Sequence, residues 1–124
     1  MIPKFRAWDK EGEVMCEVDV IGFSEGAVTI SNENVKYYHL GINEVELMQS
    51  TGLLDKNGVE IYEGDVITEE IGEGEYLFAE VIYKDGCFLG KEQNFEPEYP
   101  ISDFVKGKVI GNIYQNPELI KNET

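Results

Sequence analysis

Two carboxylates on either side of one glycine come closest, among the residues of this sequence, to the types and spacing of a reaction centre. Glu63 and Asp65 flank Gly64, and on a strand they would share one face. Neighbouring carboxylates can serve as general acid and base or bind a divalent cation together with further oxygen ligands. The alternative is a solvated turn, in which Gly64 supplies an unusual backbone angle. Because 25 of the 124 residues are acidic, close pairs arise by chance, and the turn is the interpretation we favour.

A second group of oxygen-bearing side chains lies just upstream of that pair. Asp55, Asn57, Gly58 and Glu60 have spacings that slightly resemble part of a calcium-binding loop. The full length of such a loop and its terminal glutamate are missing. Asn-Gly is a favoured hairpin turn, because both residues tolerate positive φ. We therefore expect a turn here rather than a metal site.

The only histidine, His39, could form a nucleophile–base pair with Cys16 or Cys87. A structural or exposed histidine is the alternative, and the two cysteines are too far apart in the sequence for a Cys-x-x-Cys motif. We expect both thiols to be reduced and buried. Phosphate-binding loops, nucleophile elbows and zinc motifs are absent from the sequence. These observations favour a protein that is not an enzyme and has no cofactor, while a small cation-dependent enzyme or metal site around Glu63, Asp65 and His39 stays open.

The charge of the chain is strongly negative and concentrated in one stretch. Asp and Glu exceed Lys and Arg by 25 to 10, a formal net charge of −15, and no basic residue lies between Lys56 and Lys84. Such a field repels nucleic acids and anionic membranes but attracts a basic protein. The alternative is that the acidity serves solubility alone. We predict an interaction surface that comprises Glu60, Tyr62, Glu63, Asp65, Glu69, Glu70, Glu73 and Glu75.

The pattern of turns and apolar residues predicts a mainly β fold of short antiparallel strands with little helix. Turn residues recur frequently, and β-branched and aromatic residues dominate between them. No long 3.6-residue periodicity indicates a helical bundle. We expect one helical turn at 101–105 with Ser102 as its cap, and a helix that begins at Asn116-Pro117-Glu118. The expected strands are 5–8, 13–17, 18–23, 27–31, 35–40, 45–49, 65–69, 76–83, 87–90 and 108–114, and residues 94–100 should be extended.

Regularly spaced short strands are typical of a small barrel or sandwich. We expect a single domain over residues 1–124 that allows a subdivision into an N-terminal β unit, 1–50, and a C-terminal barrel similar to SH3 domains, 51–118. Residues 119–124 form a tail, and its last four should be frayed. The aromatic residues expected in the core are Phe5, Trp8, Phe23, Phe88 and Phe104, whereas the tyrosines suit either the surface or an interface.

Four blocks of this sequence are specific strings rather than compositions: IPKFRAWD at 2–9, LMQ at 47–49, TGLLDKNGVEIYEGD at 51–65 and VIGNIYQNPE at 109–118. They resemble proteins of the YopX family of phages and prophages. The blocks cover the beginning, the middle and the end of the chain, so the resemblance extends over essentially all of it, although stretches such as 22–38 and 69–78 do not match.

The resemblance implies a mainly β fold and an origin in a bacterial mobile element, but no activity and no catalytic residues. Combined with the charge, it predicts a phage or prophage accessory protein that acts by binding a protein, either a second copy of itself or a host partner. One version is an acidic decoy for a basic, nucleic-acid-binding host protein. The N-terminus has no apolar signal region, so we expect the protein in the cytoplasm of the bacterial host.

Overall fold

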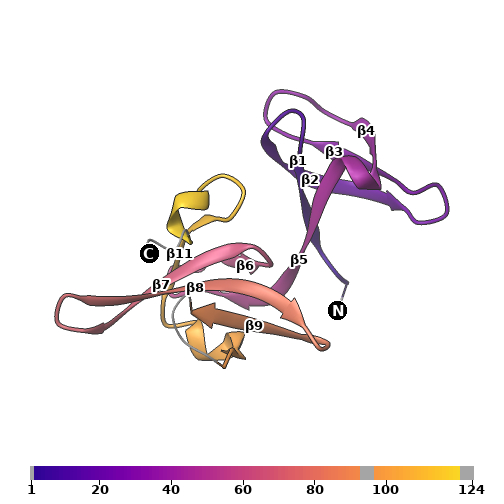
Figure 1. The fold of residues 1–124 in the computed structure, drawn as a ribbon. Coiled ribbons are helices and arrows are strands. Elements are labelled where there is room, and N and C mark those ends of the chain that lie inside the picture. The colour runs from indigo at the N-terminus through magenta and orange to yellow at the C-terminus, as the bar shows by residue number, and fades with distance from the viewer. Residues whose placement is uncertain (1, 93–96, 121–124) are drawn as a thin grey trace. The chain divides into compact units, whose positions relative to one another are not determined.

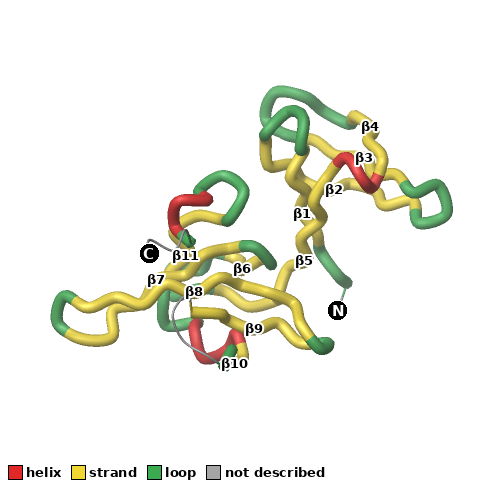
Figure 2. The backbone as a smooth tube through the Cα atoms, viewed as in Figure 1, coloured by secondary structure: helices red, strands yellow, loops and turns green. Residues whose placement is uncertain are grey.

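A computed structural model describes residues 2–92 and 97–120 of the chain. The chain divides into two compact units, Met1–Ser50 and Thr51–Thr124, and the border between them falls inside one long strand, β5 (Val45–Leu54). Figures 1 and 2 show that strands make up most of each unit. None of the described helical segments is long and apolar enough to cross a membrane.

The N-terminal unit is built from antiparallel hairpins that follow each other along the chain. Most pairings join consecutive strands, and β5 returns to pair with β1. The strand order of this sheet is β4-β3-β2-β1-β5-β6. Its elements before β5 are β1 (Phe5–Asp9), β2 (Val14–Gly22), β3 (Ala27–Ser31), β4 (Tyr38–Gly41) and the short 3₁₀ helix η1 (Ile42–Glu44).

The C-terminal unit contains β6, which neighbours β5, and a second antiparallel sheet. The strand order of that sheet is β10-β9-β8-β7-β11. The two central strands, β7 and β8, are longer than the other strands of this sheet. The elements are β6 (Glu60–Tyr62), β7 (Asp65–Gly72), β8 (Glu75–Lys84), β9 (Cys87–Glu92), β10 (Tyr99–Pro100), η2 (Ile101–Phe104), β11 (Lys108–Asn112) and η3 (Pro117–Leu119).

The prediction of a mainly β fold with little helix is confirmed, and several details differ. Residues 13–17 and 18–23 belong largely to one strand, β2, which has a bulge between Val18 and Val20. Ser102 does not cap η2, because that helix begins after Pro100 without a side-chain cap. Phe23 is not in the core but 86% exposed, since it follows β2 in a turn. The likeness of the C-terminal part to SH3 domains stays a prediction, and neither sheet closes into a barrel among the described residues. Residues 94–96 and 121–124 lie outside the described part of the chain.

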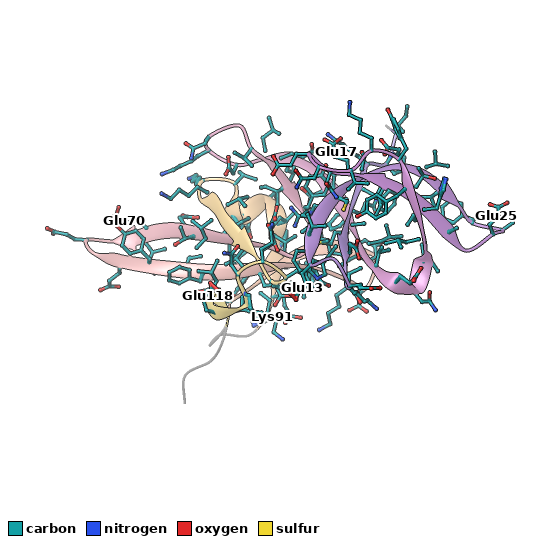
Figure 3. All side chains as sticks on the ribbon, turned by 90° about the horizontal axis from the view of Figure 1, so that it is seen from above. Glu13, Glu17, Glu25, Glu70, Lys91 and Glu118 are labelled. Carbon is teal, nitrogen blue, oxygen red and sulfur yellow. The ribbon has the colours of Figure 1, made fainter. Side chains whose placement is uncertain are left out.

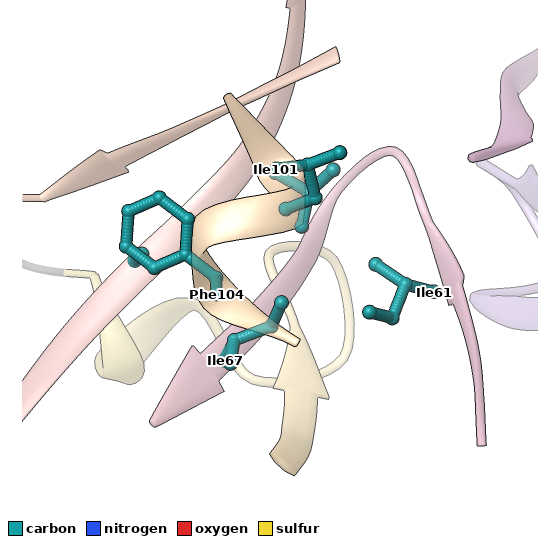
Figure 4. Packing of buried hydrophobic residues seen from close by; sticks show 6 residues of the cluster. Ile61, Ile67, Ile101 and Phe104 are labelled. Atoms are coloured by element: carbon teal, nitrogen blue, oxygen red, sulfur yellow. The ribbon is translucent and has the colours of Figure 1, made fainter. Parts of the chain in front are cut away.

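The C-terminal unit has its own hydrophobic core. Ile61 of β6 and Ile67 of β7 are fully buried, and they pack with Ile101 and Phe104 of η2 (Figure 4). Ala79 and Val81 of β8 complete the buried cluster. The helical turn between β10 and β11 therefore serves to bring two apolar side chains onto the sheet.

The core of the N-terminal unit contains a polar cluster at its margin. Its apolar part is formed by side chains such as Ala7, Val28 and Ile30, which are all buried. Beside them the Tyr38 hydroxyl donates a hydrogen bond to Asp9 Oδ2 at 2.9 Å and lies 3.2 Å from Cys16 Sγ. Burial, followed by the hydrogen bonds with Cys16 and Asp9, raises the pKa of Tyr38, so its hydroxyl keeps its proton and remains a donor to Asp9.

Replacement of Gly90 by alanine should destabilise the protein, because the new Cβ would overlap the ring of Phe104. Overpacking of this kind costs roughly 1–3 kcal/mol of the free energy of unfolding, which urea denaturation can measure. Gly72→Ala is the matched control, because a Cβ there makes only ordinary contacts with Glu75. Equal stability of the two variants would show that Phe104 does not pack against Gly90.

Candidate functional site

The carboxylates of Glu63 and Asp65 do not form a paired site. Glu63 lies in the turn before β7, and Gly64 has a φ of 88°, so the acids do not share a strand face and the turn that we favoured, with Gly64 at an unusual backbone angle, is present. Asp65 is 1% exposed, and its Oδ2 accepts a hydrogen bond from the backbone N–H of Tyr62 at 2.8 Å. Asp65 thus shapes the turn, and its side chain does not belong to an exposed interaction surface.

Asp55 forms part of the turn predicted at this position, and it also links that turn to a distant strand. Its Oδ1 accepts hydrogen bonds from the backbone N–H groups of Asn57 at 2.8 Å and Val59 at 2.9 Å. Its Oδ2 accepts one from the N–H of Val109, in β11, at 2.8 Å. The side chain is 6% exposed. Both oxygens are therefore committed to the backbone and leave no ligand for calcium.

Burial and hydrogen bonding have opposite effects on the Asp55 carboxyl. Burial alone raises its pKa, but the N–H groups of Val109, Val59 and Asn57 outweigh burial and hold the pKa below its usual value. A carboxyl group with a lowered pKa stabilises the fold at neutral pH, and this contribution is lost as the pH falls through the folded-state pKa. Asp55 thus contributes stability, and the contribution depends on its charge.

His39 does not form a pair with Cys16. The His39 ring is exposed, and its Nδ1 shares a hydrogen bond with Thr29 Oγ1 at 2.8 Å. Neighbouring Tyr38 contacts Cys16, so His39 must point from the opposite face of β4. Cys16 is buried as predicted, whereas Cys87 is exposed. Among the described residues, no group of three or more His, Cys, Asp or Glu side chains is placed to hold a metal ion.

The acidic stretch forms a feature that the sequence did not predict, an arm made of two strands. The strand β11 last pairs with β7 at Thr68, and β9 last pairs with β8 at Ala79. Beyond these points β7 and β8 pair only with each other within the described chain. Figure 1 shows their hairpin projecting past the neighbouring strands, and Figure 2 shows the turn at its tip. We call residues 69–78 the arm.

The arm combines negative charge with exposed apolar side chains. Its four charged residues, Glu69, Glu70, Glu73 and Glu75, are all acidic, and Figure 3 shows Glu70 near its outer end. Ile71 is 58% exposed and Tyr76 56% exposed. Large apolar side chains are usually buried in folded proteins. On the arm they are exposed, next to acidic residues.

The predicted interaction surface therefore divides into two parts. Glu69, Glu70, Glu73 and Glu75 lie on the arm. Glu60, Tyr62 and Glu63 lie on or beside β6 and are half-buried, and each of them makes interactions within the protein. On the arm, Glu70, Glu73 and Glu75 are exposed and Glu69 is half-buried.

The sequence prediction missed Ile71 and Phe78 as members of this surface, and it left Tyr76 open between the surface and an interface. The available signal was the glycine-rich tip, Gly72-Glu73-Gly74, which predicts a hairpin turn between two strands. The prediction ended β7 at residue 69, three residues before its end at Gly72. The arm projects because β9 and β11 end before it does. Where those strands end is determined by pairing between strands that are distant in the sequence.

Comparisons with known proteins identify the family. The sequence matches the YopX protein family over residues 4–121. This chain belongs to the YopX family. The crystal structure of protein EF1440 from Enterococcus faecalis is similar, with a TM-score of 0.71, 31% sequence identity, and coverage of 98% of this chain and 99% of that one. Among curated proteins, none matches this sequence.

A second solved structure shares the fold at lower sequence identity. The YopX protein from Bacillus subtilis has a TM-score of 0.60 and 19% sequence identity, and 98% of each chain is covered. The coverage of both structures includes the N-terminal and the C-terminal unit. The two structures support the family fold, and the residues of the arm must supply the argument for function.

Replacement of Asp55 by asparagine should lower the free energy of unfolding at pH 7 by about 2–3 kcal/mol, because it removes the charge and leaves the Val109 N–H without an acceptor. Urea denaturation at a series of pH values measures the effect. The difference should shrink as the pH falls from the ordinary pKa of 3.8 through the lower folded-state pKa, because first the unfolded and then the folded wild-type carboxyl takes up a proton.

Asp19→Asn is the control for that experiment, since Asp19 is exposed. The same chemical change at that position should alter stability by less than about 0.5 kcal/mol. If Asp55→Asn were as stable as Asp19→Asn at pH 7, Asp55 could not be the link between the turn and β11.

Proposed function

We propose that this YopX-family chain is a phage or prophage accessory protein that binds a basic host protein through its arm, in the bacterial cytoplasm and without catalysis. The observation that supports this proposal is the acidic hairpin, whose outer edges pair with no other strand among the described residues, together with the exposed side chains of Ile71 and Tyr76. Unpaired strand edges are common sites of association between proteins. The negative charge of the arm favours association with basic partners and increases the rate of that association.

The charge of the arm favours a basic partner over a second copy of the chain. If two arms paired edge to edge, the glutamates of one would face those of the other, and like charges opposite each other are destabilising. A basic surface instead meets four carboxylates and no competing cation on the arm. Self-association thus remains the weaker alternative, and light scattering should show a monomer.

Reversal of the arm's charge should abolish capture of the partner. We would immobilise the chain, expose it to a bacterial lysate and elute in steps from about 0.1 to about 0.5 M salt, across which exposed charge pairs are screened. The triple variant E70K/E73K/E75K changes three exposed glutamates. The amount of the basic protein that this variant captures should be at least about tenfold lower than for the wild type. The reason is that three charge pairs are lost, and each exposed pair contributes roughly 0.2–1 kcal/mol to binding.

The matched control is E11K/E17K/E33K, three exposed glutamates of the N-terminal unit. Both triple variants change the net charge from −15 to −9, because each Glu→Lys reversal adds two charges. The control should capture as the wild type does. Equal losses in the two variants would mean that net charge, not the arm, attracts the partner.

The apolar side chains of the arm predict a second part of the affinity that salt does not screen. The variant I71S/Y76S should raise the Kd for the captured partner about tenfold at 0.5 M salt, because burial of two large side chains is lost. The control V20S/F23S replaces two exposed apolar side chains of the N-terminal unit, Val20 and Phe23. Unchanged affinity of I71S/Y76S in a calorimetric titration would contradict an apolar contact at the arm.

A further inference from the structure

The cavity at the base of the arm contains two opposite charges that do not pair with each other. It has a volume of about 170 Å³ and is lined by Phe78, Glu80, Lys91, Leu119 and Ile120. Glu80 of β8 and Lys91 of β9 are directly opposite in the strand register. No hydrogen bond or ion pair joins them in the described structure, although the charge of Lys91 acts on the Glu80 carboxyl. Within the described part of the chain, Glu80 therefore presents to the cavity a carboxylate that no ion pair neutralises.

The environment of Glu80 suits the binding of a cation. Burial raises the pKa of the Glu80 carboxyl, while the charge of Lys91 lowers it, and burial prevails. A half-buried carboxylate without a partner is costly, and a cation that enters the cavity would offset that cost. Lys91 is exposed at the rim, so solvent competes with Glu80 for its ammonium group.

The walls of the cavity favour a cation on an apolar stem. Phe78 is 41% exposed and contributes an aromatic ring, and Leu119 and Ile120 supply aliphatic surface. A volume of about 170 Å³ is too small for a typical drug-sized ligand, for which pockets measure roughly 300–1,000 Å³. It is suited to a single side chain. Arginine fits best, because its stem packs on apolar surface, its guanidinium stacks on aromatic rings, and its fork binds carboxylates with two hydrogen bonds.

We infer that the cavity formed by Phe78, Glu80, Lys91, Leu119 and Ile120 binds an arginine side chain of the basic partner and so anchors that partner at the base of the arm. This inference rests on the proposed function, since the arm attracts the partner whose arginine the cavity receives. Tyr76 and Phe78 lie two residues apart on β8 and thus point from the same face. Apolar contacts on the arm therefore continue into the cavity.

The inference predicts opposite effects for the two charged residues of the cavity. The probe is N-acetyl-arginine amide, titrated while the backbone amide signals are followed by NMR. Glu80→Gln should raise the Kd about three- to tenfold, because the carboxylate is lost, and Lys91→Gln should lower it about two- to fivefold, because a like charge is removed. The blocked citrulline analogue, which has the shape of arginine without its charge, should bind at least about fivefold more weakly.

Matched controls separate the cavity from general electrostatics. Glu17→Gln and Lys108→Gln make the same charge changes at exposed positions elsewhere, and neither should change the Kd more than about 1.5-fold. Glu80→Gln should also unfold no more readily than the wild type, since burial disfavours the charged form that it removes. A higher Kd of Glu80→Gln for the arginine probe therefore cannot be explained by unfolding of the variant.

Two results would overturn the inference: an effect of Glu80→Gln no larger than that of Glu17→Gln, or equal binding of arginine and citrulline. Failure of the cavity is distinguishable from failure of the proposed function. If E70K/E73K/E75K loses the partner while Glu80→Gln captures it with wild-type affinity, the arm binds and the cavity does not anchor. If the cavity binds arginine but the arm variant still captures the partner, the arm is not the docking element.

Discussion

A single buried carboxylate ties each unit of this protein together. In the C-terminal unit Asp55 holds its own turn with Oδ1 and reaches Val109 in β11 with Oδ2. In the N-terminal unit Asp9 does the same, since its Oδ1 accepts from the N–H groups of Glu11 and Gly12 and its Oδ2 accepts from the Tyr38 hydroxyl. Both aspartates are more than nine-tenths buried. A turn and a distant strand in each unit thus depend on one charged side chain, which is favourable only because all its hydrogen bonds are made.

The arm depends on the link that Asp55 makes. Val109, which Asp55 binds, is opposite Ile67 in the sheet, and β11 last pairs with β7 at Thr68. The arm begins at the next residue. A hairpin of two strands is only marginally stable alone in water, so the arm requires a rigid base. The buried cluster around Ile67 and Phe104 provides that base, and we propose that the ten residues of the arm meet the partner.

Much of the fold could be predicted from the sequence because its turns are locally encoded. Asp85 and Gly86 both have positive φ, which is the requirement that makes Asp-Gly a hairpin signal. The turn at Asp55 was predicted for the same reason. The second oxygen of Asp55 could not be placed, because its partner is 54 residues away and nothing local distinguishes Val109 from other strand residues.

The site was predicted only in part, for the same physical reason. Charge showed that residues 69–75 face solvent, and the structure agrees for Glu70, Glu73 and Glu75. The charge of the sequence could not show that Asp65 is buried. A turn whose carboxylate is buried and hydrogen-bonded to the backbone has the same residue types as a turn whose carboxylate is solvated. Phe23 shows the converse, since an aromatic residue was expected in the core and is exposed. Exposure of apolar residues in the arm likewise depends on where neighbouring strands end.

The central claim is that a stably anchored arm docks a basic protein, and amide hydrogen exchange of the chain with and without the captured partner tests it most directly. In the free protein the amides of residues 69–78 should exchange much faster than those of β7 and β8 near Ile67 and Val81, which lie in the core. In the complex the arm should become protected while the N-terminal unit is unchanged. Protection that appears in the N-terminal unit, with the arm exchanging as before, would contradict the account.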